Sequence, residues 1–129
     1  MKKEDKHIED KIVLYQTDNG NVDISVQFNK DTVWLNREQL STLFNRDIKT
    51  IGKHINNVFK EEELIKSSTV AKFATVQTEG DRDVTRNIEF YNLDVIISIG
   101  YRVKSKEGTQ FRIWATNTLK EHLIKGYTV

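Results

Sequence analysis

Residues 35–59 contain two amphipathic patterns separated by a polar break. The first is opened by Asn36 and, three residues later, Gln39, a pair that is the signature of a capping box. Its apolar positions recur at helical spacing, at Leu40, Leu43 and Phe44. The second pattern repeats apolar residues every three or four positions, at Ile48, Ile51, Ile55, Val58 and Phe59. Both patterns predict short helices.

The break between them reads Asn45, Arg46, Asp47. Asn tolerates the left-handed conformation that a sharp turn requires, and Asp47 can cap the helix that follows. The stretch therefore predicts a helix-turn-helix. The outward face of its second helix is expected to carry Lys49, Thr50, Lys53, His54, Asn56 and Asn57.

Side chains of these types read base edges in the major groove, and no acidic residue occurs among them. The face therefore suggests a recognition helix for duplex DNA. A helical hairpin with a merely solvated polar face would show the same pattern, so both interpretations stay open.

The segment before this motif has the pattern of a three-stranded β-meander. Residues 11–17 form a β-rich run, and Asn19 with Gly20 is a pair favoured in tight hairpins. Residues 22–28 alternate apolar and polar positions, as a half-buried strand does. A second turn at residues 29–31 leads into residues 32–35 and the first helix.

Residues 69–91 predict a long β-hairpin, with strands at 69–77 and 84–91 and a loop at 78–83. A hairpin directly after a recognition helix is typical of a winged helix. Thr75, Thr78, Arg82 and Arg86 would then be candidates for phosphate contacts. Three carboxylates of the loop, Glu79, Asp81 and Asp83, oppose such contacts by charge repulsion.

Two helices are expected after the hairpin. Asn92 can cap the first, over residues 92–101, and a basic loop with Gly108 follows it. Thr109 is expected to cap the second, which Lys125 and Gly126 would end. The fold class predicted is α+β and winged-helix-like: a three-stranded meander, a helix-turn-helix, a wing-like hairpin and two C-terminal helices.

Charge is distributed unevenly along the 129 residues, although the net charge is only +1. Residues 36–60 hold five basic and two acidic residues, and residues 100–129 hold six basic and two acidic ones. A local excess of positive charge of this kind is what the binding of a polyanion requires. The basic side chains expected to neutralise phosphates are Arg46, Lys104, Lys106 and Arg112.

Composition predicts one cytoplasmic domain over residues 11–129, after a mixed-charge, disordered leader at 1–10. The chain has no cysteine, no apolar run near the ~20 residues of a membrane span, and no secretory pattern. Its three histidines lack metal-ligand spacing, and no phosphate-binding loop occurs. Glu79, Asp81 and Asp83 could bind hydrated Mg²⁺, but carboxylates at a hairpin tip are usually just solvated. We expect no metal, no cofactor, no small-molecule substrate and no enzymatic activity.

Six blocks of sequence resemble the RhuM family of bacterial and prophage-borne, virulence-associated proteins. They are IVLYQT at 12–17, VWL at 33–35, STVAKFATVQTEG at 68–80, YNLD at 91–94, ISIGYRV at 97–103 and GTQFRIWAT at 108–116. The end of the chain is also similar, more weakly, to N-terminal domains of phage antirepressors. The resemblance implies a DNA-binding N-terminal region of a mobile-element-associated protein, usually followed by a longer C-terminal part. The chain departs from the usual pattern at Asn45 to Asp47, where relatives often have glycine, and at Gly52, where a hydroxyl is common.

These observations together predict a regulator of transcription or of a mobile element that binds double-stranded DNA as a homodimer on a palindromic site. Two alternatives remain open. The fold could serve as a protein interaction module, or the chain could belong to a nuclease or toxin-like enzyme whose chemistry lies outside this segment.

Overall fold

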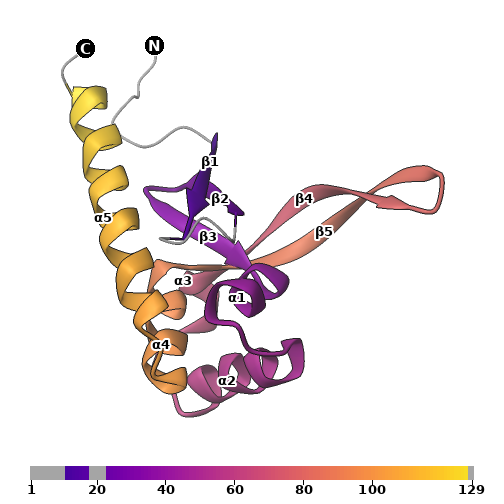
Figure 1. Ribbon diagram of the computed structural model, residues 1–129, viewed down its shortest axis with the longest axis horizontal. Coiled ribbons are helices and arrows are strands. Elements are labelled where there is room, and N and C mark those ends of the chain that lie inside the picture. Colours follow the sequence, from indigo (N-terminus) through magenta and orange to yellow (C-terminus); the bar gives the residue numbers. More distant parts are fainter. Residues whose placement is uncertain (1–10, 18–22, 128–129) are drawn as a thin grey trace.

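The computed structural model describes residues 11–17 and 23–127, with side chains up to Glu121. The expected leader at 1–10 and the turn at Asn19 and Gly20 lie outside the described residues. The described part is α+β and has two layers: five antiparallel strands, and helices that cover one face of their sheet (Figure 1). The predicted α+β class is confirmed.

The meander expected at the N-terminal end is present. β1 (Lys11–Gln16), β2 (Asp23–Asn29) and β3 (Thr32–Asn36) pair in that order, each antiparallel to the next. Lys30 and Asp31 both have positive φ, 53° and 64°, as the two central residues of a tight hairpin turn do. β3 then runs directly into the first helix.

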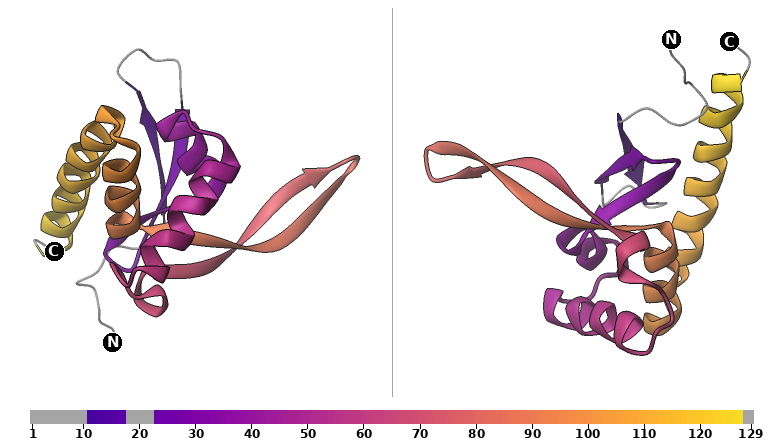
Figure 2. Two further views of the ribbon diagram at one scale, coloured as in Figure 1. Left: turned by 90° about the horizontal axis from the view of Figure 1, so that it is seen from below. Right: turned by 180° about the vertical axis from the view of Figure 1, so that it is seen from behind.

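The two strands of the hairpin are longer than predicted, and they join the same sheet. β4 (Val70–Glu79) and β5 (Arg82–Asn92) pair along their whole length, and β3 pairs with β5, so the strand order is β1-β2-β3-β5-β4. The predicted loop at 78–83 is wrong, because Thr78 donates a side-chain hydrogen bond to Asp83 at 3.0 Å and the strands continue to a turn at Gly80 and Asp81. Residues 73–88, which we call the arm, project away from the body (Figures 1 and 2).

Five helices occur in the described residues: α1 (Arg37–Phe44), α2 (Ile48–Lys60), α3 (Lys66–Thr69), α4 (Leu93–Val103) and α5 (Lys106–Tyr127). The one-turn helix α3 was not predicted. Thr109 does not cap α5, because Ser105 accepts the backbone N–H of Glu107 and the helix starts at Lys106. The predicted end at Gly126 is also wrong, since α5 continues to Tyr127.

The core lies between the helices and one face of the sheet. Alternate strand residues supply its sheet side, and they include Tyr15, Val26, Phe28, Val33, Leu35 and Tyr91. Trp114 of α5 packs against this side, with ring centroids 4.9 Å from Tyr15 and 6.0 Å from Phe28. The prediction that Ile48 is buried is wrong: it occupies the first position of α2 and is 45% exposed.

Two glycines allow α4 and α5 to approach closely. A Cβ on Gly108 would lie 3.1 Å from the Phe44 ring and 3.3 Å from the Cα of Gly100. Gly108 is therefore a buried contact between helices and not the turn residue that the sequence suggested. This contact fixes the start of α5 beside α1 and α4.

Candidate nucleic-acid interface

Side-chain caps define the three-residue turn between α1 and α2. Asn36 and Gln39 form the predicted capping box, in which each side chain bonds the backbone of the other. Asn45 ends α1 with a left-handed φ of 54°, and Asp47 accepts the backbone N–H of Thr50 at 2.7 Å. Hydrogen bonds from the side chain and then the backbone of Thr50 hold the pKa of Asp47 below its usual value. The start of α2 is thus fixed by the polar residues that the sequence pattern singled out.

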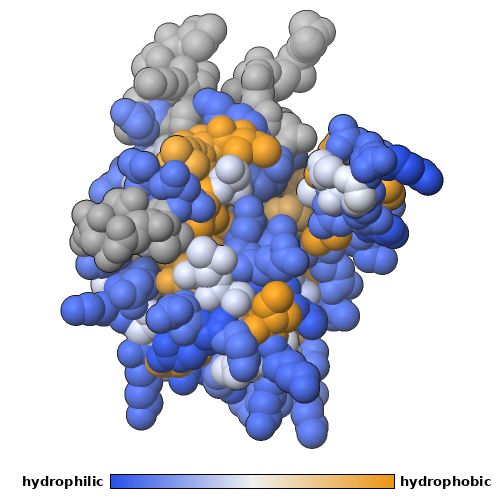
Figure 3. Space-filling view, turned by 45° about the vertical axis from the view of Figure 1, so that its right-hand side comes forward, coloured by the Kyte–Doolittle hydropathy of each residue, from blue (hydrophilic) through white to orange (hydrophobic). Residues whose placement is uncertain are grey.

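The outward face of α2 is accessible. Lys49, Lys53 and Asn56 are exposed and lie on one stripe of the helix, since they are spaced four and three residues apart. Thr50, His54 and Asn57 form a parallel stripe and are half-buried. Hydrophilic side chains cover the lower part of the molecule in Figure 3, where α2 lies. The exposure of Lys49, Lys53 and Asn56 shows that no other described segment covers this stripe.

A hydrogen bond brings a second basic segment beside α2. Arg46, in the turn before α2, donates from Nη2 to the carbonyl oxygen of Val103 at 3.1 Å, and from Nη1 to that of Phe44 at 3.0 Å. The turn between α4 and α5, with exposed Lys104 and Lys106, is thereby held next to the start of α2. The basic residues around the start of α2 and those of the turn between α4 and α5, which were predicted separately from the sequence, therefore lie side by side on one surface.

The carboxylates that follow α2 are bonded to side chains of α4. Arg102 Nη2 lies 2.8 Å from a carboxylate oxygen of Glu61 and 2.8 Å from one of Glu63. Ser98 also donates to Glu63 at 2.8 Å. Hydrogen bonds from Arg102 and then Ser98 lower the pKa of Glu63. The sequence analysis missed Arg102 and Ser98, although their spacing of four residues places both on one face of α4.

His54 is more enclosed than the prediction assumed. Its Nδ1 is buried and has no hydrogen-bond partner among the described residues. Burial, and then the positive charges of Arg102, Lys53 and Arg46, lower the pKa of His54. The imidazole is therefore neutral near pH 7, and it can offer hydrogen bonds to DNA but little charge.

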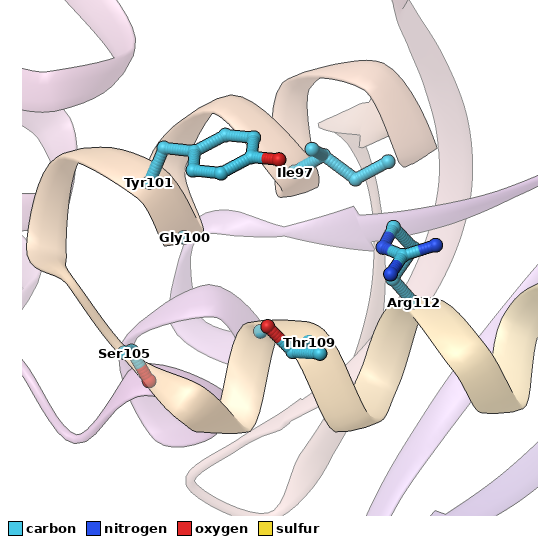
Figure 4. Close-up of a pocket in the computed structure, with 7 residues that line it drawn as sticks. Ile97, Gly100, Tyr101, Ser105, Thr109 and Arg112 are labelled. Atoms are coloured by element: carbon cyan, nitrogen blue, oxygen red, sulfur yellow. The ribbon is translucent and has the colours of Figure 1, made fainter.

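Gly52 does not lie where the sequence analysis placed it. Gly52 is buried and faces α1, where an added Cβ would lie 3.1 Å from Nη1 of Arg37, so it is not an outward position of α2 that lacks a hydroxyl. Arg112 lines a small pocket with Tyr101 and Ile97 at the crossing of α4 and α5 (Figure 4). Ser105, which lies between Lys104 and Lys106, lines the same pocket.

The acidic end of the arm does not form a metal site in the described residues. Glu79 receives two hydrogen bonds from Arg86, at 2.7 and 2.8 Å, and Asp83 accepts one from Thr78. No group of three His, Cys, Asp or Glu suited to a metal ion occurs among the residues described. In the same part of the chain, no helix has the length and apolar character of a membrane span.

Comparison with known proteins gives a match to a family model. The model of the Virulence protein RhuM family matches residues 68–129, from the end of α3 to the last residue, and confirms the predicted resemblance for this part. The match includes Lys104, Lys106 and Arg112 but not α1 and α2. No curated protein and no solved structure matches the chain.

Proposed function

We propose that this chain, whose residues 68–129 match the model of the Virulence protein RhuM family, binds duplex DNA with α2 as its recognition helix. The observation that carries the proposal is the exposed stripe of Lys49, Lys53 and Asn56 on a capped helix. A helix of this length fits the major groove, and lysine and asparagine provide phosphate and base-edge contacts.

In this proposal Arg46, Lys104 and Lys106 position the domain on the DNA backbone. The hydrogen bond from Arg46 to Val103 places the two lysines beside the start of α2, so one duplex would meet both segments. Lysines that neutralise phosphates release the counterions condensed on the DNA, and this release favours binding. Thr50, His54 and Asn57 form the half-buried margin of this interface. Arg112 is exposed and lines one pocket with Ser105, between the two lysines, so it stays a candidate for a further phosphate contact.

The arrangement we propose is winged-helix-like, in that a β-hairpin follows the helix pair. The arm itself takes no part in the DNA contact that we propose. Arg86 is already bonded to Glu79, and the tip adds the carboxylates of Asp81 and Asp83, which a phosphate backbone would repel. The expected role is that of a regulator associated with a mobile element, as the resemblance implies.

Equilibrium binding of a fluorescent random-sequence duplex, at several salt concentrations, tests the proposal. The logarithm of the association constant should fall linearly with the logarithm of the salt concentration. Lys49→Gln together with Lys53→Gln should reduce the magnitude of this slope by about 2, because each phosphate contact contributes about 0.9.

The matched control removes two lysines elsewhere, Lys66→Gln and Lys120→Gln, both from exposed positions. This variant has the same net charge as the test variant, and it should retain the wild-type slope. Equal slopes for the two variants would show that charge alone, and not the α2 face, governs binding. Absence of binding at low salt would refute the proposal.

A further inference from the structure

The arm has two edges that no other strand covers in the described part of the chain. β4 is the last strand of the sheet, and β3 pairs with β5 only at residues 90–92. Beyond these residues the arm is a two-stranded ribbon, which is marginally stable alone in water. Unpaired edges of this length also offer backbone N–H and C=O groups to another strand.

The two edges differ in charge. β5 has four charged residues between positions 82 and 89: Arg82, Asp83, Arg86 and Glu89. β4 has none from Phe73 to Thr78, contains no proline, and keeps an unbroken register with β5, without a bulge. Charges, proline and bulges are the devices that protect an edge strand from pairing. The edge of β5 is therefore protected, and that of β4 is not.

The exposed side chains of the β4 edge are of the types usually found on strands inside a sheet. Val76 is 65% exposed, and Ala74 and Thr78 lie on the same face of the arm. Three of the charged groups near the tip are bonded within the arm: Arg86 donates to Glu79, and Asp83 accepts from Thr78. This part of the arm thus presents a neutral, β-branched surface to a partner strand.

We propose that the β4 edge pairs antiparallel with β4 of a second copy of this chain, so that two sheets join into one. A two-fold axis perpendicular to the sheet leaves each residue on the same face in both copies, and directly opposed side chains lie on the same face. Because successive side chains alternate between the faces, two opposed residues must both have odd numbers or both have even numbers. Centring the axis on Thr75 aligns residues 71–79 of both copies. It also keeps the two bodies at opposite ends of the joined arms, as the direction of the arm in Figure 1 requires.

This register is complementary in polarity and charge. Ala74 lies opposite Val76 of the second copy, and Phe73 lies opposite Gln77. Lys72 lies opposite Thr78, whose neighbour on β5 is Asp83, so each end of the paired segment sets a lysine near a carboxylate of the other copy. No like charges are opposed between the two β4 strands, and such opposition would be destabilising. A second copy is therefore the occupant that this edge fits.

Sedimentation equilibrium without DNA tests this proposal independently of the proposed function. The wild-type chain should form dimers, and Val76→Lys should raise the dimer dissociation constant about tenfold, since each copy then adds a charge to the joint. Thr85→Lys is the matched control. Thr85 is directly opposite Val76 on the same face, but on the protected edge, and this change should leave the dissociation constant within about twofold of wild type.

Cysteine crosslinking checks the register, and the chain has no cysteine of its own. Under oxidation Thr75→Cys should form a disulfide-linked dimer, because the Cα atoms of directly opposed residues lie within disulfide range. Thr85→Cys should stay monomeric under the same conditions. A monomeric wild-type chain at all concentrations, a dimer weakened equally by both lysine variants, or crosslinking only through Thr85→Cys would each overturn the proposal.

Discussion

Arg46 Nη2 and the carbonyl oxygen of Val103 are joined by a 3.1 Å hydrogen bond, although the two residues are 57 positions apart in the sequence. Val103 ends α4, and Lys104, in the left-handed conformation at φ 56°, starts the turn to α5. Carbonyl groups at the end of a helix lack partners within it, so a guanidinium is a favourable donor there. One side chain thus links the helix pair to the matched C-terminal part of the chain.

Replacement of this guanidinium is expected to loosen that link. Arg46→Met keeps much of the aliphatic stem but removes the bonds to Phe44 and Val103, and it should lower the free energy of unfolding by about 1 kcal/mol. Urea titration followed by tryptophan fluorescence measures the change. Arg112→Met, which removes an equal charge from an exposed position, is the control and should change stability by less than about 0.5 kcal/mol.

Two glycines should respond in opposite ways to alanine. Gly108→Ala forces a Cβ against the buried Phe44 ring and the backbone of Gly100, and it should destabilise the fold by about 1 to 3 kcal/mol. Gly52→Ala meets only the end of the flexible Arg37 side chain. It should keep most of the gain of about 1 kcal/mol in helix propensity.

Thermal unfolding of both variants measures these changes in stability. Gly52→Ala in an Arg37→Ala background then isolates the contribution of the contact with Arg37. The gain from alanine at position 52 should be larger in that background. A strong destabilisation by Gly52→Ala in both backgrounds would contradict the assigned contact.

The pKa of His54 predicts a dependence of stability on pH. Because the folded chain lowers this pKa below 6.5, the unfolded chain binds a proton more readily. The contribution of His54 to stability is thus fully present above about pH 6.5, and it is lost as the pH falls toward the pKa of the folded state. His54→Gln should flatten the pH dependence of the free energy of unfolding between pH 7 and 5. Equal slopes in this interval for the variant and the wild type would refute the lowered pKa.

Much of the local structure could be predicted because it depends on neighbouring residues. Asn36, Asp47 and Asn92 all cap the helices that the sequence assigned to them, and Asn45 adopts the expected left-handed turn. In each case a short polar side chain bonds a backbone group three residues away or bends the chain locally. Such interactions are visible in the order of residues alone.

Interactions between distant segments could not be predicted in this way. The sequence pattern places Gly52 on the outward side of α2, whereas in the fold Arg37 of α1 lies beside it. Arg102 binds Glu61 and Glu63, which lie 41 and 39 positions away in the sequence. The length of the arm depends on cross-strand bonds such as that between Thr78 and Asp83. The polar residues at its tip looked like a loop, because turn residues and solvated strand residues have similar composition.

The central claim is that the outward face of α2 meets duplex DNA, and site-directed photocrosslinking tests it most directly. A benzophenone side chain at Asn56 should crosslink to the duplex, whereas the same group at Lys120, exposed on α5, should not. Efficient crosslinking from position 120 with none from position 56, at a protein concentration that saturates the DNA, would contradict the account.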